Sequence, residues 1–247
     1  MHWLAQRLLG SMSLGVFERV RRSASLLRTL ALVAVLWVAS DLGYYLLLPV
    51  FGLRLGYSSQ PLALALYYAL WVGIAIWVFG PLYRTWTPYE NRLRTNALLL
   101  ASFGGVVLFA VYALPALPPI VWTEIWDAPE LMIATQWYFA PKSIEILFQQ
   151  LLIAALVLSF AAERISVRTI AICCALLFGG AHLLLGFGGL PFGYVTRFVA
   201  AASAFGLLFP YLILQLRNGF VYSYALHWLY YLVTIVTAHT LSPYVQY

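Results

Sequence analysis

Apolar residues fill seven long runs of this chain, and the short segments between the runs hold most of the charged residues. The runs predict membrane-spanning helices at 29–51, 61–83, 96–117, 142–162, 168–187, 196–216 and 219–241. About 20 apolar residues in an α-helix span the hydrocarbon core of a bilayer. The apolar positions are continuous rather than alternating, which excludes a transmembrane β-barrel. The pattern therefore predicts an all-α, polytopic membrane helix bundle with about seven spans in a single domain, 29–247.

The composition supports a membrane protein and excludes one that binds nucleic acid. Of the 247 residues, 64% are hydrophobic and 9% are charged, whereas soluble domains are about 25% charged. The net charge of +6 comes from basic residues between the apolar runs, where such residues orient a chain. Eleven of the 14 basic residues fall on the side of the N-terminus, and Arg54, Lys142 and Arg197 fall on the other side. We therefore expect the N-terminus inside and the C-terminus outside. The compact form of the chain favours a bacterial inner membrane.

Two segments outside the apolar runs carry predictions of their own. Residues 1–28 hold five arginines among apolar side chains. They form either an interfacial amphipathic helix or a basic flank that fixes the orientation. The outer loop 116–141 is rich in proline, tryptophan and tyrosine. It is either a cover over the bundle, which the usual enrichment of aromatic residues at this depth favours, or a lid or docking surface for a partner.

Few ionisable side chains lie inside the predicted spans, and these are the candidates for chemistry. They include Glu145, His182 and His227, with Asp41 in the first span. An ionised side chain at the centre of a membrane helix costs roughly 2.5–3.5 kcal/mol on insertion scales, so each of these residues requires a reason. Asp41 is either hydrogen-bonded inside the bundle or part of a proton relay, although no second acid in the sequence supports the relay.

Three interpretations of Glu145, His182 and His227 follow from their chemistry. Two histidines and one glutamate are ligand types of a catalytic zinc site, so one divalent metal such as zinc would be the cofactor. Alternatively, Glu145 acts as a general base on water while a histidine donates to the developing oxyanion. In the third interpretation the residues only hydrogen-bond helices to one another, which is the commoner role of a buried histidine.

The same residues carry a resemblance to a known family. Segments Ile144–Gln149, Phe178–His182 and His227–Tyr231 are similar in order and spacing to three motifs, Glu-Glu-x-x-x-Arg, Phe-x-x-x-His and His-x-x-x-Asn. These motifs belong to the CPBP family of intramembrane proteases, also called the ABI or CAAX prenyl endopeptidase family. The resemblance covers about 142–232, a CPBP-like core. It implies catalytic roles for Glu145, His182 and His227 and supporting roles for Gln149, Phe178 and Tyr231.

The chain departs from the family pattern at three positions. Ile144 stands where the family has its first glutamate, which is thought to activate water, and isoleucine cannot move a proton. Gln149 replaces the family's arginine and lacks the positive charge that would keep a carboxylate ionised. Tyr231 replaces the asparagine and is bulkier. The resemblance is therefore to a family whose first motif is degenerate here.

Two functions remain open from the sequence. The first is an intramembrane endopeptidase that hydrolyses a peptide bond of a membrane protein or lipidated peptide. The second is a catalytically inactive relative that acts as a subunit or assembly factor of a membrane protein complex. The two histidines favour the first function, whereas the degenerate first motif and the aromatic outer loop favour the second.

Overall fold

The computed structural model describes residues 25–86, 91–123, 129–188 and 192–245. Most of the predicted basic flank, residues 1–24, lies outside these ranges, as do residues 124–128 of the outer loop. The predictions made for those two segments therefore concern residues outside the described part of the chain.

Every apolar run that the sequence predicts to be a span coincides with a helix. The elements are the first helix Ser25–Val50, which ends in a π-helical turn Gly43–Leu47 and α2 Leu48–Val50; α3 Pro61–Trp86; α4 Arg92–Leu108, continued by Phe109–Ala113 and Leu114–Ala116; α5 Phe139–Ala162, preceded by Gln136–Tyr138; α6 Val167–His182, followed by Leu183–Gly188; α7 Phe192–Gln215; and α8 Gly219–Leu241. Among the described residues, six helices are long and apolar enough to cross a membrane, and α6 is a shorter apolar helix. The chain is thus an all-α, multi-pass membrane protein, as predicted.

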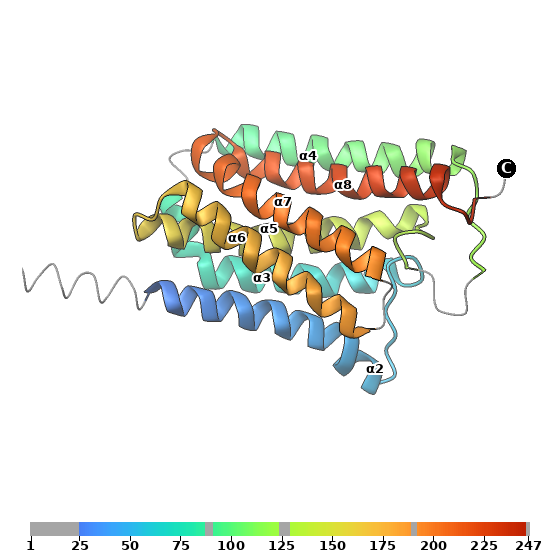
Figure 1. Cartoon of the computed structure of the whole chain (residues 1–247), viewed down its shortest axis with the longest axis horizontal. Coiled ribbons are helices and arrows are strands. Elements are labelled where there is room, and N and C mark those ends of the chain that lie inside the picture. Colours follow the sequence, from blue (N-terminus) through green and yellow to red (C-terminus); the bar gives the residue numbers. More distant parts are fainter. Residues whose placement is uncertain (1–24, 87–90, 124–128, 189–191, 246–247) are drawn as a thin grey trace, which may run out of the picture.

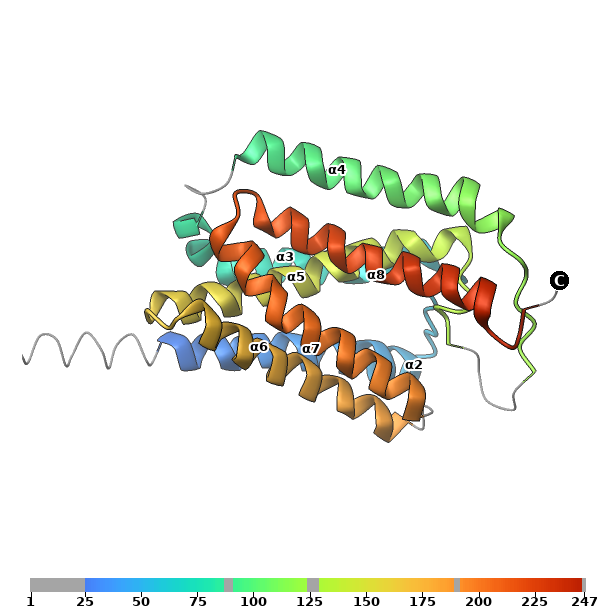
Figure 2. The same cartoon turned by 45° about the horizontal axis from the view of Figure 1, so that its top comes forward.

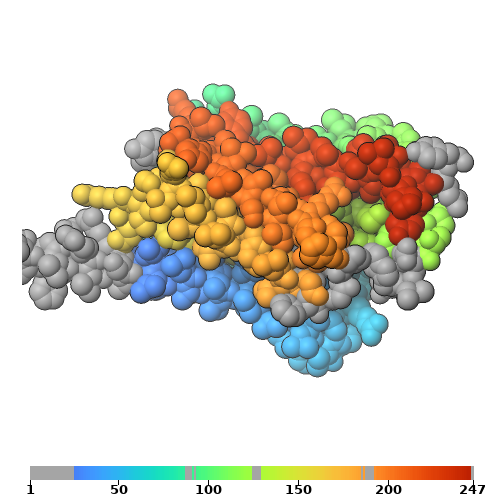
Figure 3. All heavy atoms as spheres, viewed as in Figure 1, coloured from blue at the N-terminus to red at the C-terminus, as the bar shows by residue number. Residues whose placement is uncertain are grey.

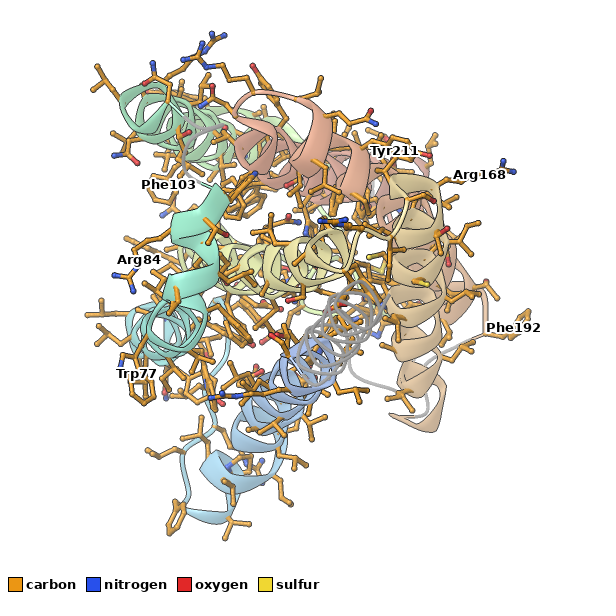
Figure 4. All side chains as sticks on the ribbon, turned by 90° about the vertical axis from the view of Figure 1, so that its left-hand side faces the viewer. Trp77, Arg84, Phe103, Arg168, Phe192 and Tyr211 are labelled. Atoms are coloured by element: carbon orange, nitrogen blue, oxygen red, sulfur yellow. The ribbon has the colours of Figure 1, made fainter. Side chains whose placement is uncertain are left out.

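Helix α5 is the central element of the bundle. Figure 4 looks along the bundle and shows α5 enclosed by the other helices, while the labelled Trp77, Arg84 and Phe192 point outward. The buried residues of α5 lie on every side of the helix, and a helix that is apolar all round is expected in the interior. Residues on different faces of α5 therefore meet different neighbouring helices.

Helices α6 and α7 form the closest helix pair, which Figure 3 shows as the yellow and orange surface across the middle of the molecule. Glycine allows this approach, because a Cβ atom at Gly206 would overlap the backbone of Cys174 and Ala175. Gly179 on α6 likewise faces Ser203 on α7 with no room for a side chain. Small residues of this kind let membrane helices approach closely. The α6–α7 hairpin is consequently a tightly packed unit of the bundle.

Helix α4 lies at the periphery and is fastened at its two ends. Figure 2 shows it set apart from the other helices, with α8 as its nearest neighbour. At the end where α4 begins, the Asn218 amide nitrogen donates to the carbonyl of Asn91 (3.2 Å) and to the Thr95 hydroxyl (2.6 Å). Beyond its other end, the Val121 N–H donates to the Tyr244 carbonyl (2.9 Å). The middle of α4 is therefore open on most of its circumference.

The basic residues divide between the two ends of the bundle. Residue 25 and the C-terminal residues lie at opposite ends, as an odd number of crossings requires (Figure 1). Residues Arg28, Arg84, Arg94, Arg164, Arg168 and Arg217 lie in helix ends and turns at the same end as residue 25, which we call the Arg-rich end. This distribution is the one from which an inside N-terminus is expected. Which side of the membrane the Arg-rich end faces stays a prediction.

The position of Lys142 differs from the prediction. The sequence makes it the first residue of the span 142–162, at the outer end, whereas α5 starts three residues earlier, at Phe139. Pro141 lies in the first turn of the helix, where its missing N–H breaks no helical hydrogen bond. Lys142 is therefore a helical residue with only 8% of its surface exposed, and it belongs to the interior of the bundle.

Candidate functional site

The site is built around an ion pair on one face of α5. Lys142 and Glu145 are three residues apart, so their side chains share a face of the helix. The Lys142 Nζ atom lies 2.8 Å from the Glu145 Oε2 atom, and both residues are 8% exposed. Lys142 thus supplies the positive charge beside Glu145 that Gln149 cannot supply. The sequence analysis missed this partner because it counted Lys142 only as an orienting charge at the outer end of the span 142–162.

The Glu145 carboxylate accepts two further hydrogen bonds. The Tyr57 hydroxyl donates to Oε2 (2.5 Å), and the Gln149 Nε2 atom donates to Oε1 (2.9 Å). The Tyr57 hydroxyl also lies 3.2 Å from that of Tyr68 on α3. With Lys142, the carboxylate has three donors, and both of its oxygens are engaged. A buried charge with a structural role is expected to be paired and hydrogen-bonded in this way.

Tyr57 reaches Glu145 from the loop between the first helix and α3. The Glu130 carboxylate accepts the backbone N–H of Tyr57, and the Thr135 N–H donates to the Ser58 hydroxyl (3.3 Å). Burial raises the pKa of the Tyr57 phenol well above its ordinary value, and burial likewise raises the pKa of the Glu130 carboxyl. Tyr57 therefore stays a neutral donor to Glu145. A contact across 88 residues could not be predicted from the sequence pattern.

Lys142 also contacts two aromatic rings. Its Nζ atom lies 5.1 Å from the centre of the Tyr57 ring and 4.6 Å from that of Tyr231 on α8. Such cation–π contacts are worth about 2 kcal/mol when desolvated. Tyr231, predicted as a supporting residue in the place of an asparagine, thus lies against the ammonium group and is 8% exposed.

His227, a residue of α8, belongs to a second group of polar side chains, which lies between α8 and α5. Its Nδ1 atom lies 3.0 Å from the Gln150 Nε2 atom, and the Ser223 hydroxyl donates to the Gln150 Oε1 atom (2.9 Å). The His227 ring is nearly parallel to that of Tyr231, with their centres 5.5 Å apart. Gln150 is five residues from Glu145, so the two side chains leave α5 on different faces. Tyr231 is the residue that contacts both the Lys142 ammonium and the His227 ring.

His182 is held by its own helix. Its Nδ1 atom lies 2.7 Å from the carbonyl oxygen of Phe178. Because a carbonyl only accepts, Nδ1 carries the proton, which leaves Nε2 as an acceptor. The ring stacks on Phe198 of α7 at 6.4 Å between centres. Phe178 packs with Trp37 on the first helix, so its side chain supports the α6 contact with that helix.

The three predicted catalytic residues do not form a metal-binding group. Across the described ranges, no set of three or more His, Cys, Asp or Glu side chains is placed so that it could hold a metal ion. Glu145 is engaged by Lys142, Tyr57 and Gln149, while His227 is bonded to Gln150. The residues present therefore do not fit the zinc site that the sequence left open.

A small cavity adjoins Glu145 on the side away from His227. Its volume is about 10 Å³, and residues of the first helix, α3 and α5 line it: Trp37, Ser40, Asp41, Tyr68, Glu145, Phe148, Gln149 and Leu152. This is about the space that one water molecule needs. Asp41 and Glu145 both line this cavity. Glu145 is therefore a second acid near Asp41, and the sequence alone did not reveal that the two are neighbours.

Comparisons of the chain with protein-family models, curated proteins and solved structures find no match. The resemblance to the CPBP family consequently rests on the three motifs. The function has to be argued from the geometry of the site.

Proposed function

We propose that this chain is a catalytically inactive, CPBP-like membrane protein that acts by binding a partner membrane protein, as a subunit or assembly factor. The observation that carries the proposal is the engagement of both Glu145 oxygens by Lys142, Tyr57 and Gln149. A general base needs a free lone pair within reach of the water that it deprotonates. Here the Lys142 ammonium and the Tyr57 phenol occupy both lone pairs of Oε2, and the Gln149 amide occupies one of the two on Oε1.

The exposed face of α4 supports the partner-binding part of the proposal. Ala97, Ala101 and Gly105 follow one another at four-residue spacing, and all three are exposed. A Cβ atom at Gly105 would meet nothing within 4 Å. A small-xxx-small stripe of this kind allows the backbone of another membrane helix to approach closely. We infer that the occupant is a transmembrane helix of the partner.

The endopeptidase remains a second candidate, favoured by the cavity beside Glu145. A cavity of about one water volume next to a carboxylate is where a hydrolytic water would sit. The Nε2 atom of His182 is an acceptor, because the Nδ1–H group donates its hydrogen bond to the Phe178 carbonyl oxygen. The two candidates make opposite predictions about cleavage.

A cleavage assay decides between the two candidates. We expect the purified protein in lipid nanodiscs to cleave membrane-embedded peptides, with or without a C-terminal lipid, no faster than a Lys142→Met/Glu145→Gln double variant. This variant removes the candidate base together with its counter-charge, so that no buried charge is left unpaired. Cleavage by the wild type that the double variant lacks would refute the proposal and establish the endopeptidase.

The α4 stripe gives a test of partner binding. A photo-crosslinking side chain at Ala101 should yield one discrete product with a partner, and Gly105→Leu should abolish that product because leucine blocks close helix approach. Gly73→Leu on α3 is the matched control, since a Cβ atom there also meets nothing within 4 Å. A product that persists in Gly105→Leu, or that is lost equally in Gly73→Leu, would contradict binding at this stripe.

A further inference from the structure

A second feature of the site, independent of the proposed function, is the carboxyl group of Asp41. Asp41 lies within the first helix, nine residues before its end at Val50. Its carboxyl receives a hydrogen bond from Trp37, one turn earlier, and it lines the cavity that Glu145 also lines. Unlike Glu145, Asp41 is exposed at the surface of the bundle. It therefore stands between the cavity and the surroundings of the first helix.

The charges around the cavity do not balance. Among the described residues, the ionisable side chains that interact with Asp41 are Glu145 and Lys142 from α5, Tyr67 from α3 and Tyr45 from its own helix, and Tyr68 from α3 lines the same cavity. The tyrosines are neutral. Lys142 is already paired with Glu145 at 2.8 Å. An ionised Asp41 would thus leave one net negative charge at membrane depth, on a side chain exposed at the surface of the bundle, where an uncompensated charge is costly.

Binding one positive charge would neutralise Asp41. The cavity has room for about one water molecule, so only a small cation can be that charge. The uncharged polar side chains that line the cavity are those of Ser40, Tyr68 and Gln149. The Ser40 hydroxyl already gives its proton to the Trp37 carbonyl (2.7 Å), so it offers an oxygen to the cavity. Such a setting suits a protonated carboxyl with one water, because the acid proton needs a single acceptor.

We propose that Asp41 and the adjoining cavity form a proton-binding site, in which the Asp41 carboxyl takes up one proton while the Lys142–Glu145 pair stays ionised. The first helix widens into a π-helical turn at Gly43–Leu47, two residues after Asp41. Turns of this kind frequently mark functional positions in helices. The Asp41 carboxylate takes the proton from solvent and returns it to solvent, so the step changes the charge of the site by one unit.

The test is the dependence of stability on pH for the full chain in lipid nanodiscs. The wild type should lose stability as pH rises from about 4, where the aspartate of an unfolded chain ionises, until the Asp41 carboxyl of the folded state is itself ionised, because over that range only the folded state still binds the proton. Asp41→Asn should show no such loss and should exceed the wild-type melting temperature at alkaline pH by about 5–10 °C. Glu163→Gln, which removes a carboxylate at the Arg-rich end, should keep the wild-type profile.

Infrared spectroscopy gives a second readout that a purely structural role would not move. The carbonyl band of a protonated carboxylic acid should be present in the wild type and in Glu163→Gln and absent in Asp41→Asn. Parallel pH profiles for wild type and Asp41→Asn would overturn the proposal. So would stabilisation of the wild type by sodium over choline at fixed pH and ionic strength, which would assign the site to a metal cation instead.

Discussion

Replacing Lys142 with methionine should destabilise the folded bundle by about 3–5 kcal/mol, the usual cost of leaving one partner of a buried ion pair without the other. The remaining Glu145 carboxylate would keep Tyr57 and Gln149 as donors but would lose the ammonium group that is its positive partner among the described residues. The cation–π contacts with Tyr57 and Tyr231 would be lost as well. The measurement is the free energy of unfolding in mixed micelles, followed by helical circular dichroism.

The double variant Lys142→Met/Glu145→Gln separates the effect of an unpaired charge from the effect of altered packing. Replacing both members of a buried pair by neutral groups of similar volume is often neutral or stabilising. We therefore expect the double variant to lie within about 1–2 kcal/mol of the wild type. If it were as unstable as Lys142→Met alone, packing rather than charge compensation would explain the role of Lys142.

The second large effect is expected at the crossing of α6 and α7. Gly206→Ala should lower the free energy of unfolding by about 1–3 kcal/mol, and Gly206→Leu by more, because the new side chain would overlap the backbone of Cys174 and Ala175. A backbone segment cannot rotate away as a side chain can. The helices would therefore have to separate along their contact, and the measurement is again unfolding in mixed micelles.

Gly180 provides the control for Gly206. It lies on α6, and a Cβ atom there would meet nothing within 4 Å. Gly180→Ala should therefore be neutral or slightly stabilising, since alanine has the higher helix propensity by about 1 kcal/mol. Equal losses in Gly206→Ala and Gly180→Ala would show that the α6–α7 contact is looser than the structure has it.

The helices could be predicted from the sequence because their signal is local. Each apolar run needs only its own residues to indicate a span, and the runs at 61–83 and 219–241 fall within α3 and α8. The helix that was predicted to start at Lys142 starts three residues earlier, at Phe139, because the apolar pattern does not mark the first turn of a helix. Pro141 occupies the first turn of α5.

The candidate site was only partly predictable, since its partners come from distant parts of the chain. The interior positions of Glu145 and His227 follow from their apolar surroundings. The contacts of Glu145 with Tyr57 and of His227 with Gln150 depend on which faces of α5 meet which neighbours. No periodicity in a single sequence encodes that choice. The neighbourhood of Asp41 and Glu145 was missed for the same reason.

The enclosure of α5 has a consequence for biosynthesis. When this segment leaves the translocon, it carries Lys142 and Glu145, and its counterparts on later helices have not been made. Tyr57 and α3 have already entered the bilayer by then, so they can receive the Glu145 carboxylate as α5 emerges. Tyr231, on the last helix, completes the cage around the ammonium only when synthesis ends. The order of the segments along the gene thus lets the acidic group meet its partners before the last contact of the basic group can form.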